Sequence, residues 1–187
     1  MATYFDFTVS LQDVLPRPWR RFLIAGTASF ATLSTAIQDA CGWSGGHLFR
    51  FQATGAYDGD AIAGLRIGDG DDDMDGIVPD AKNVKVTRQF APGRSTTCLY
   101  LYDFGDDWTH DVQLNDVVSL RQRFRRRLAG GEHAFPPEDC GGPWGYMSLR
   151  AAMRTGRDPD GLVAWARETW GWTGEFDLDV VRAAFDK

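Results

Sequence analysis

The chain has 187 residues, of which 43% are hydrophobic and 25% are charged. This length and composition predict one globular domain over residues 1–187, and they exclude a disordered chain. The net charge of -6 excludes a surface that is basic throughout, so any contact with nucleic acid would need a local basic patch.

The cysteines Cys41, Cys98 and Cys140 are odd in number and lack CxxC spacing, and the chain does not open with a cationic segment followed by an apolar run. Both features favour a reducing cytoplasm over secretion. The longest apolar stretches are much shorter than the roughly 20 residues of a membrane helix. We therefore expect a cytoplasmic protein without a membrane partner.

Hydrophobic alternation predicts a first strand over residues 4–11. Its inward residues should be Phe5, Phe7, Val9 and Leu11. A helix should follow over residues 30–41, because apolar residues recur there at steps of three and four. Thr27 or Ser29 would cap its start, and Gly42 would follow its end.

Residues 47–53 alternate like an extended segment, with neighbouring side chains on opposite faces. Residues 55–80 are rich in Gly and Asp and predict a long exposed loop. Two strand-like runs within residues 96–116 flank the segment 103–107, where Gly105 could supply a positive φ for a bulged hairpin turn. This hairpin should form the centre of an antiparallel sheet.

Residues 120–128 fit either a helix or a strand. As a strand, one face would carry Arg121, Arg123, Arg125 and Arg127. Short helices are predicted at residues 148–154, 161–170 and 177–185. The expected fold class is therefore α+β: a single domain, mainly antiparallel sheet, with one early helix and a helical C-terminal third packed on it.

Two motif segments, residues 100–112 and 136–146, combine carboxylates, aromatic rings and turn-forming Gly or Pro. This mixture is typical of shaped surface loops. We expect the two segments to lie against each other, and every site hypothesis below depends on that contact.

Four blocks carry a family resemblance: Pro18–Arg21, Cys41–Phe51, Tyr102–His110 and Pro136–Tyr146. With these blocks in this order, the chain resembles the Ri-plasmid ORF-3-like protein family, also called insertion-element passenger or TnpR-like proteins. The resemblance implies a compact α+β fold, an association with plasmids and mobile elements, and an extended conformation for residues 121–128. It does not imply a serine recombinase, because no block supplies a nucleophilic Ser with nearby Arg residues.

The chain also departs from the pattern of that family. Relatives commonly carry Cys at the position of Phe135, another Cys close to Arg127, and His at the position of Phe49. Tetrahedral zinc needs four Cys or His ligands. Near the matching blocks only Cys140 remains, together with His47, His110 or His133, and this falls short of such a set. A structural zinc site is therefore not expected.

Acidic and imidazole side chains in the two motif segments could bind a hard cation or transfer a proton if they converge. This candidate catalytic set comprises Asp106, Asp107, His110, Asp111, Glu138 and Asp139. The alternative is that these carboxylates accept backbone hydrogen bonds in turns, or pair with Arg20 or Arg21. The histidines likewise could serve the structure by bonding to backbone carbonyls.

The acidic segment offers Asp71, Asp73 and Asp75 as weak candidates for a calcium site. Position twelve of that loop is Lys82, however, where an EF-hand needs Glu. A solvated acidic loop is the alternative. Cys140 lacks an assured basic neighbour and is a weak candidate nucleophile.

The aromatic residues of the blocks could line a binding groove or fill the core. The candidate binding set comprises Trp108, Trp144, Tyr146, Trp43 and Trp19, with His47 and Arg20. The arginines of residues 121–127 could bind phosphate, or could protect an exposed edge strand by charge.

The leading hypothesis is a non-enzymatic binding or adaptor domain that recognises a protein or peptide through a groove between the motif segments. The second is a metal-dependent hydrolase or nuclease that uses Asp106, Asp107, His110, Glu138 and Asp139. The third is a nucleic-acid accessory protein that uses the arginine strip. We expect no cofactor, and only the second hypothesis requires a divalent metal ion.

Overall fold

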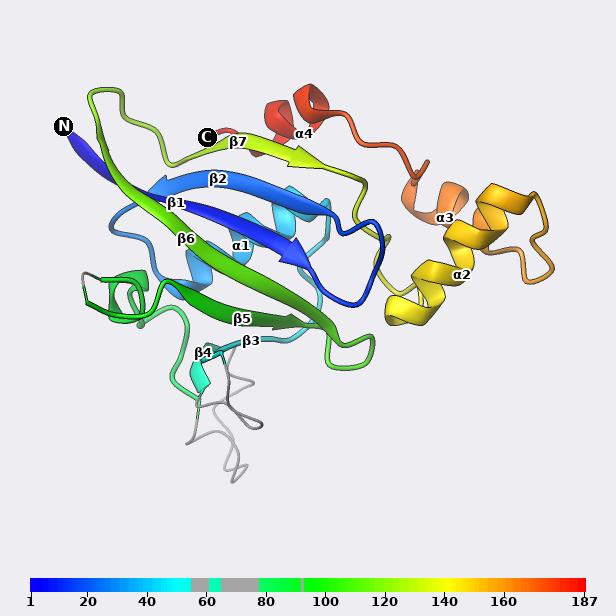
Figure 1. Ribbon diagram of the computed structural model, residues 1–187, viewed down its shortest axis with the longest axis horizontal. Coiled ribbons are helices and arrows are strands. Elements are labelled where there is room, and N and C mark those ends of the chain that lie inside the picture. The colour runs from blue at the N-terminus through cyan, green and yellow to red at the C-terminus, as the bar shows by residue number, and fades with distance from the viewer. Residues whose placement is uncertain (55–60, 65–77, 92) are drawn as a thin grey trace.

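A computed structural model describes residues 1–54, 61–64, 78–91 and 93–187. Seven antiparallel strands form one sheet in the order β4-β3-β5-β6-β1-β2-β7 (Figure 1). The strands are β1 Ala2–Leu11, β2 Trp19–Ala25, β3 Phe49–Gln52, β4 Ala61–Gly64, β5 Thr97–Tyr102, β6 Trp108–Leu120 and β7 Arg126–Glu132. The helices are α1 Phe30–Cys41, the short 3-10 helix η1 Val86–Arg88, α2 Gly142–Thr155, α3 Leu162–Trp170 and α4 Leu178–Phe185. The α+β class is confirmed.

The first strand and the early helix form as predicted and contribute side chains to one hydrophobic core. The inward side chains Phe5, Phe7, Val9 and Leu11 are all buried. They join the core that α1 covers on one face of the sheet, while α2 and α3 lie beyond the end where β1 finishes (Figure 1). The Ser29 hydroxyl accepts the Thr32 N–H at 3.3 Å, and Gly42 ends α1 in the left-handed conformation at φ 83.

The prediction of a long exposed loop over residues 55–80 is wrong at residues 61–64. Residues 61–64 form β4, which pairs with β3, and Ala63 is fully buried. The sequence Ala-Ile-Ala-Gly is too short to show a period that sequence reasoning could recognise as a strand. Residues 55–60 and 65–77, including the calcium candidates Asp71, Asp73 and Asp75, lie outside the described residues.

The hairpin of β5 and β6 is confirmed, with Tyr102 opposite Trp108, and β6 is the central strand of the sheet. The predicted role of Gly105 in its turn is wrong. The positive φ values lie at Asp103 and Asp107, both 56°. Asp103 tolerates this conformation because its carboxylate accepts the Gly105 N–H at 3.0 Å.

Residues 120–128 match neither predicted form over their whole length. Strand β6 ends at Leu120, residues 121–125 form a connection, and β7 begins at Arg126. The four predicted arginines therefore do not share one face of a strand. Arg126 is the buried member of the run: its Nε donates to the Phe185 carbonyl at 2.7 Å, and its guanidinium forms an ion pair with Asp39.

The C-terminal helices form close to their predicted positions, but α2 begins at Gly142 and so includes the last part of the second motif segment. Helix α4 packs against β7 and α1. The final residues continue onto β7: the Lys187 carbonyl accepts the Arg126 N–H at 3.1 Å, and the Asp186 carboxylate accepts the Leu128 N–H at 2.7 Å. Within the described residues, no helix is long and apolar enough to cross a membrane.

Candidate functional site

The two motif segments lie against each other at the end of the sheet that α2 adjoins. The Gly141 N–H donates to the Asp106 carboxylate at 3.1 Å, and the Tyr102 hydroxyl donates to Glu138 at 2.5 Å. The hairpin turn (residues 103–107) and the proline-glycine loop (residues 136–141) therefore form one junction, although about thirty residues separate them along the chain.

Glu138 serves this junction as a structural acceptor. It is 2% exposed, and its second oxygen accepts the Ser44 N–H at 2.6 Å, which joins the segment after α1 to the same point. Burial, followed by the bond to Glu138, raises the pKa of Tyr102. Glu138 thus has both oxygens engaged and does not face an open space where a substrate could meet it.

A glycine makes the close packing of the second segment possible. A Cβ atom added to Gly145, in the first turn of α2, would lie 1.7 Å from the Cys140 carbonyl oxygen. Any side chain there would force the loop and the helix apart. The glycine content of this motif therefore has a structural explanation.

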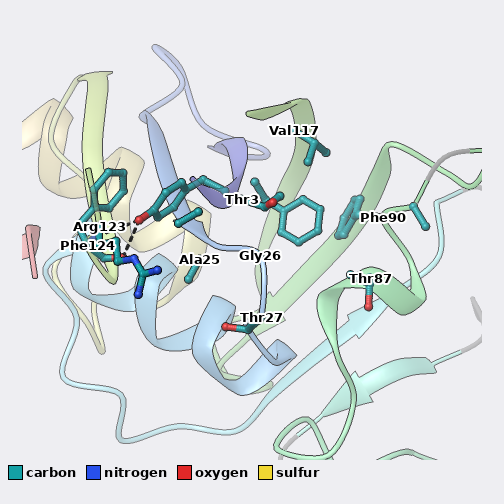
Figure 2. A pocket seen from close by; sticks show the side chains of 13 residues that line it. Thr3, Ala25, Gly26, Thr27, Thr87, Phe90, Val117, Arg123 and Phe124 are labelled. Carbon is teal, nitrogen blue, oxygen red and sulfur yellow. Dashed lines mark hydrogen bonds between the residues drawn. The ribbon is translucent and has the colours of Figure 1, made fainter. Parts of the chain in front are cut away.

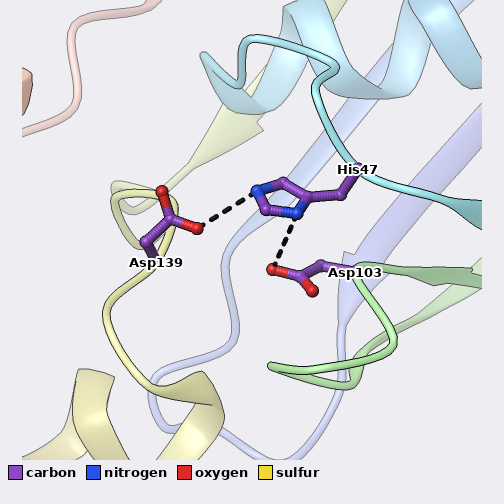
Figure 3. A group of neighbouring side chains, drawn as sticks. All are labelled: His47, Asp103 and Asp139. Carbon is purple, nitrogen blue, oxygen red and sulfur yellow. Dashed lines mark ion pairs between the residues drawn. The ribbon is translucent and has the colours of Figure 1, made fainter.

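His47 lies between two carboxylates, one from each motif segment (Figure 3). Its Nε2 is 3.1 Å from Asp139 Oδ1, and its Nδ1 is 3.5 Å from Asp103 Oδ2. One ligand atom from each residue lies within 4.8 Å of the others, and no other His, Cys, Asp or Glu group of three in the described part of the chain meets this test. The arrangement could hold a divalent ion, or a protonated imidazole that donates to both carboxylates.

Sequence reasoning named His47 and Asp139 but missed Asp103. The available signal was its position: Asp103 opens the predicted turn, directly after a strand. A carboxylate at that point is fixed by the turn itself, since the other Asp103 oxygen accepts the Gly105 N–H.

His110 does not join the acidic residues, so the predicted catalytic set is not assembled. Its ring is fully buried, 5.3 Å from Trp43 and stacked at 6.0 Å on Phe135. Its Nδ1 lies 3.3 Å from the Tyr100 carbonyl, and Nε2 has no hydrogen-bond partner among the described residues. Burial lowers the pKa of His110 to about 4. The following residue, Asp111, points outward and pairs with Arg17 at 2.5 Å.

Most of the predicted aromatic groove is core. Trp108 and Tyr146 are fully buried and Trp43 is 5% exposed, whereas Trp144 is 87% exposed. Trp19 is half-buried, with its indole N–H 3.3 Å from Glu132. Of the predicted ring set, Trp144 alone is left as a large exposed contact surface.

Arg20 is also a structural residue and does not pair with Glu138 or Asp139. Its guanidinium lies over the rings of Phe135 and Phe176, and burial lowers its pKa to about 10. Its hydrogen bonds go to the carbonyl oxygens of Trp19, Ala40, Glu132 and His133. The neighbouring Arg21 pairs with Asp6 at 2.6 Å.

Two weaker candidates are Cys140 and the arginines of residues 121–127. Burial raises the pKa of Cys140 to about 12, which leaves the thiol protonated and poorly nucleophilic at neutral pH. The arginine strip required for the nucleic-acid hypothesis is not formed, since Arg121, Arg123 and Arg125 lie in the connection after β6. The guanidinium of Arg127 instead lies over the Phe124 ring.

An open cleft of about 730 Å³ remains between the hairpin turn and the start of α2. We call it the acidic cleft. Its lining residues are Asp13, Gly105, Asp106, Asp107, Gly141, Gly142, Pro143, Trp144 and Met147. It thus combines three carboxylates with the exposed Trp144 ring and a methionine, and its lining includes no basic residue.

Comparison with known proteins identifies the family. The family model for the plasmid pRiA4b ORF-3-like protein matches residues 3–184. This chain belongs to that family. It is 30% identical over 187 residues to the uncharacterized protein y4hQ of Sinorhizobium fredii, covering all of this chain and 89% of that protein.

A solved structure shows the same fold as this plasmid pRiA4b ORF-3-like chain. It is the crystal structure of a protein of unknown function, MM3350, from Methanosarcina mazei Go1. The two superpose with a TM-score of 0.79 at 23% identity, over 96% of this chain and 98% of that one. In the present member of the family, three of the four blocks noted in the sequence meet at the junction through Ser44, Tyr102 and Glu138.

Proposed function

We propose that this domain is a binding module that takes a basic segment of a protein or peptide into the acidic cleft. The observation that carries the proposal is the exposed Trp144 ring beside three carboxylates in one cleft of about 730 Å³. A Lys or Arg side chain suits such a site, because its cation can lie over an indole face while its N–H groups donate to carboxylates.

The chemistry of the cleft supports binding over catalysis. Its lining consists of Asp, Gly, Pro, Trp and Met, and so places no nucleophile beside a base. His110 and Cys140, the two groups that could have supplied one, are buried and do not line the cleft. The net charge of -6 would also draw a cationic partner toward the domain.

The substitution Trp144→Ala should weaken binding of basic peptides by about tenfold or more, the effect of removing an aromatic binding residue at an interface. The fold should be unaffected because the side chain is 87% exposed. Fluorescence titration with a peptide library graded by net charge would measure the change, with circular dichroism to check folding.

Phe104→Ala provides the matched control. Phe104 is a 52% exposed aromatic residue of the hairpin turn beside the acidic cleft, but it does not line that cleft. Equal losses in the two variants, or tighter binding of acidic peptides by the wild type, would contradict the proposal.

A second candidate function, a metal-dependent hydrolase or nuclease, is favoured by the group of His47, Asp103 and Asp139. Its one nitrogen and two oxygen donors suit Zn²⁺ or Mn²⁺, and the partly exposed side chains leave room for water on the ion. This group differs from the predicted catalytic set and shares only Asp139 with it.

Zn²⁺ or Mn²⁺ at about 100 times its dissociation constant should then stabilise the wild type by about 2.7 kcal/mol, because it binds only the folded state. The His47→Gln variant should lose this gain, whereas Asp111→Asn, which changes a carboxylate outside the group, should keep it. Thermal unfolding with and without each ion measures the effect. Equal shifts in wild type and His47→Gln would remove the metal candidate and leave the imidazole as an ion-pair bridge.

A further inference from the structure

A second cavity lies at the other end of β1 from the acidic cleft (Figure 2). Its volume is about 660 Å³, within the range of small-molecule sites. It is lined by Ala2, Thr3, Tyr4, Phe5, Ala25, Gly26, Thr27, Thr87, Phe90, Ala91, Val117, Arg123 and Phe124. The acidic cleft contributes none of these residues.

The walls of this cavity are mainly apolar. Phe5 and Phe90 belong to the core, at 4% and 0% exposure, while Val117 is 46% exposed. The three threonines supply hydroxyl groups, and the single charged side chain is Arg123. Such a surface favours a ligand with an apolar body and one charged or polar group.

The segment that carries Arg123 is held in place by Tyr4. The Tyr4 ring stacks on Phe124 with 4.1 Å between centroids, and its hydroxyl accepts the Phe124 N–H at 2.9 Å. The same hydroxyl lies 3.2 Å from the carbonyl oxygens of Gln122 and Phe124. The backbone on both sides of Arg123 is therefore fixed at the cavity wall.

The guanidinium of Arg123 is available to a ligand. No ion pair or side-chain hydrogen bond engages it within the described ranges, whereas Arg17, Arg21, Arg126 and Arg182 each pair with a carboxylate. A planar guanidinium recognises a carboxylate through two parallel hydrogen bonds. As the one charged side chain in the lining of an apolar cavity, Arg123 selects for a ligand with an anionic head group.

We propose that this cavity binds a small amphiphilic carboxylate, whose apolar body lies against Phe5, Phe90 and Val117 and whose head group pairs with Arg123. The proposal also gives a role to one arginine of the run at residues 121–127. It is independent of the peptide-binding function, because the two sites share no lining residue.

Displacement of a fluorescent apolar anion, anilinonaphthalene sulfonate, tests the proposal with two competitors of equal chain length, decanoate and decanol. Decanoate should displace the probe at lower concentration than decanol. Arg123→Gln should weaken decanoate by about fivefold, the upper range for an exposed ion pair, and leave decanol unchanged. Thr87 is exposed at the cavity wall, and Thr87→Trp should fill the cavity. This variant should therefore bind neither the probe nor the two competitors.

Arg121→Gln is the matched control, since it removes a charge from the same connection but does not line the cavity. It should bind decanoate as the wild type does. Equal affinity for decanoate and decanol in the wild type, equal losses in the two arginine variants, or unchanged binding in Thr87→Trp would each overturn the proposal.

Discussion

Acidification from pH 6.5 to about 4 should cost the folded protein about 3 kcal/mol through His110 alone, because burial lowers its pKa from 6.5 to about 4. Above pH 6.5 the imidazole is neutral in both the folded and the unfolded chain, and His110 adds no pH dependence. Between the two pKa values the unfolded chain binds a proton that the folded chain does not. The free energy of unfolding therefore falls as the pH falls.

Urea unfolding of the wild type and His110→Phe across this pH range would isolate the effect. Other titrating groups contribute to both proteins, so the difference between the two free energies of unfolding should change by about 3 kcal/mol. Near neutral pH that difference reports the fit of the Phe ring beside Trp43 and Phe135 and the loss of the contact to the Tyr100 carbonyl. A difference that stays constant with pH would show that the pKa of His110 is the same in the folded and unfolded chains, and would contradict the prediction.

Gly145→Ala should destabilise the protein by about 3 kcal/mol, the upper range for an overpacked site. The added methyl group would lie 1.7 Å from the Cys140 carbonyl oxygen, a distance that no rotamer change can relieve because both atoms are fixed by backbone. The start of α2 must shift, and the bond from Gly141 to Asp106 should break with it. The acidic cleft should therefore lose its shape in this variant.

Gly156→Ala separates this packing effect from ordinary glycine strain. Gly156 follows the same helix at φ +69, and a Cβ there would meet nothing within 4 Å. Its replacement should cost only about 1 kcal/mol for the left-handed backbone. Chemical denaturation of both variants gives the comparison, and similar losses would show that the contact at Gly145 relaxes easily.

The regular elements with a strong hydrophobic period could be predicted from the sequence. Strand β1, helix α1 and the β5–β6 hairpin combine such periods with capping or turn residues, so local chemistry determines them. Strand β4 could not be found, because its four residues are too few to show a period and it is defined by its pairing with β3. Residues 120–128 were ambiguous for a related reason: β6 ends at Leu120 and β7 begins at Arg126, and no local pattern marks either boundary.

The candidate site was predictable as a contact between two segments but not as a set of side chains. His110 follows Trp108 by two residues on β6, so strand alternation alone would have placed both on the buried face with Val112. Trp43 follows the end of α1, and Trp144 lies in the first turn of α2, which begins before the predicted helix at residues 148–154. The exposure of these two rings could therefore not be told apart from the sequence. The position of His47 depends on three segments meeting, a property of the whole fold.

The hydrogen bonds that Asp186 and Lys187 make to β7 also have a consequence for self-association. They occupy backbone groups at the outer side of the last strand, the kind of groups through which sheets of separate molecules join. If these two residues detached, the backbone groups of β7 that they occupy could pair with a strand of a second copy of the chain. Asp186 and Lys187 thus protect the β7 edge of the sheet, the edge opposite β4, from intermolecular strand pairing.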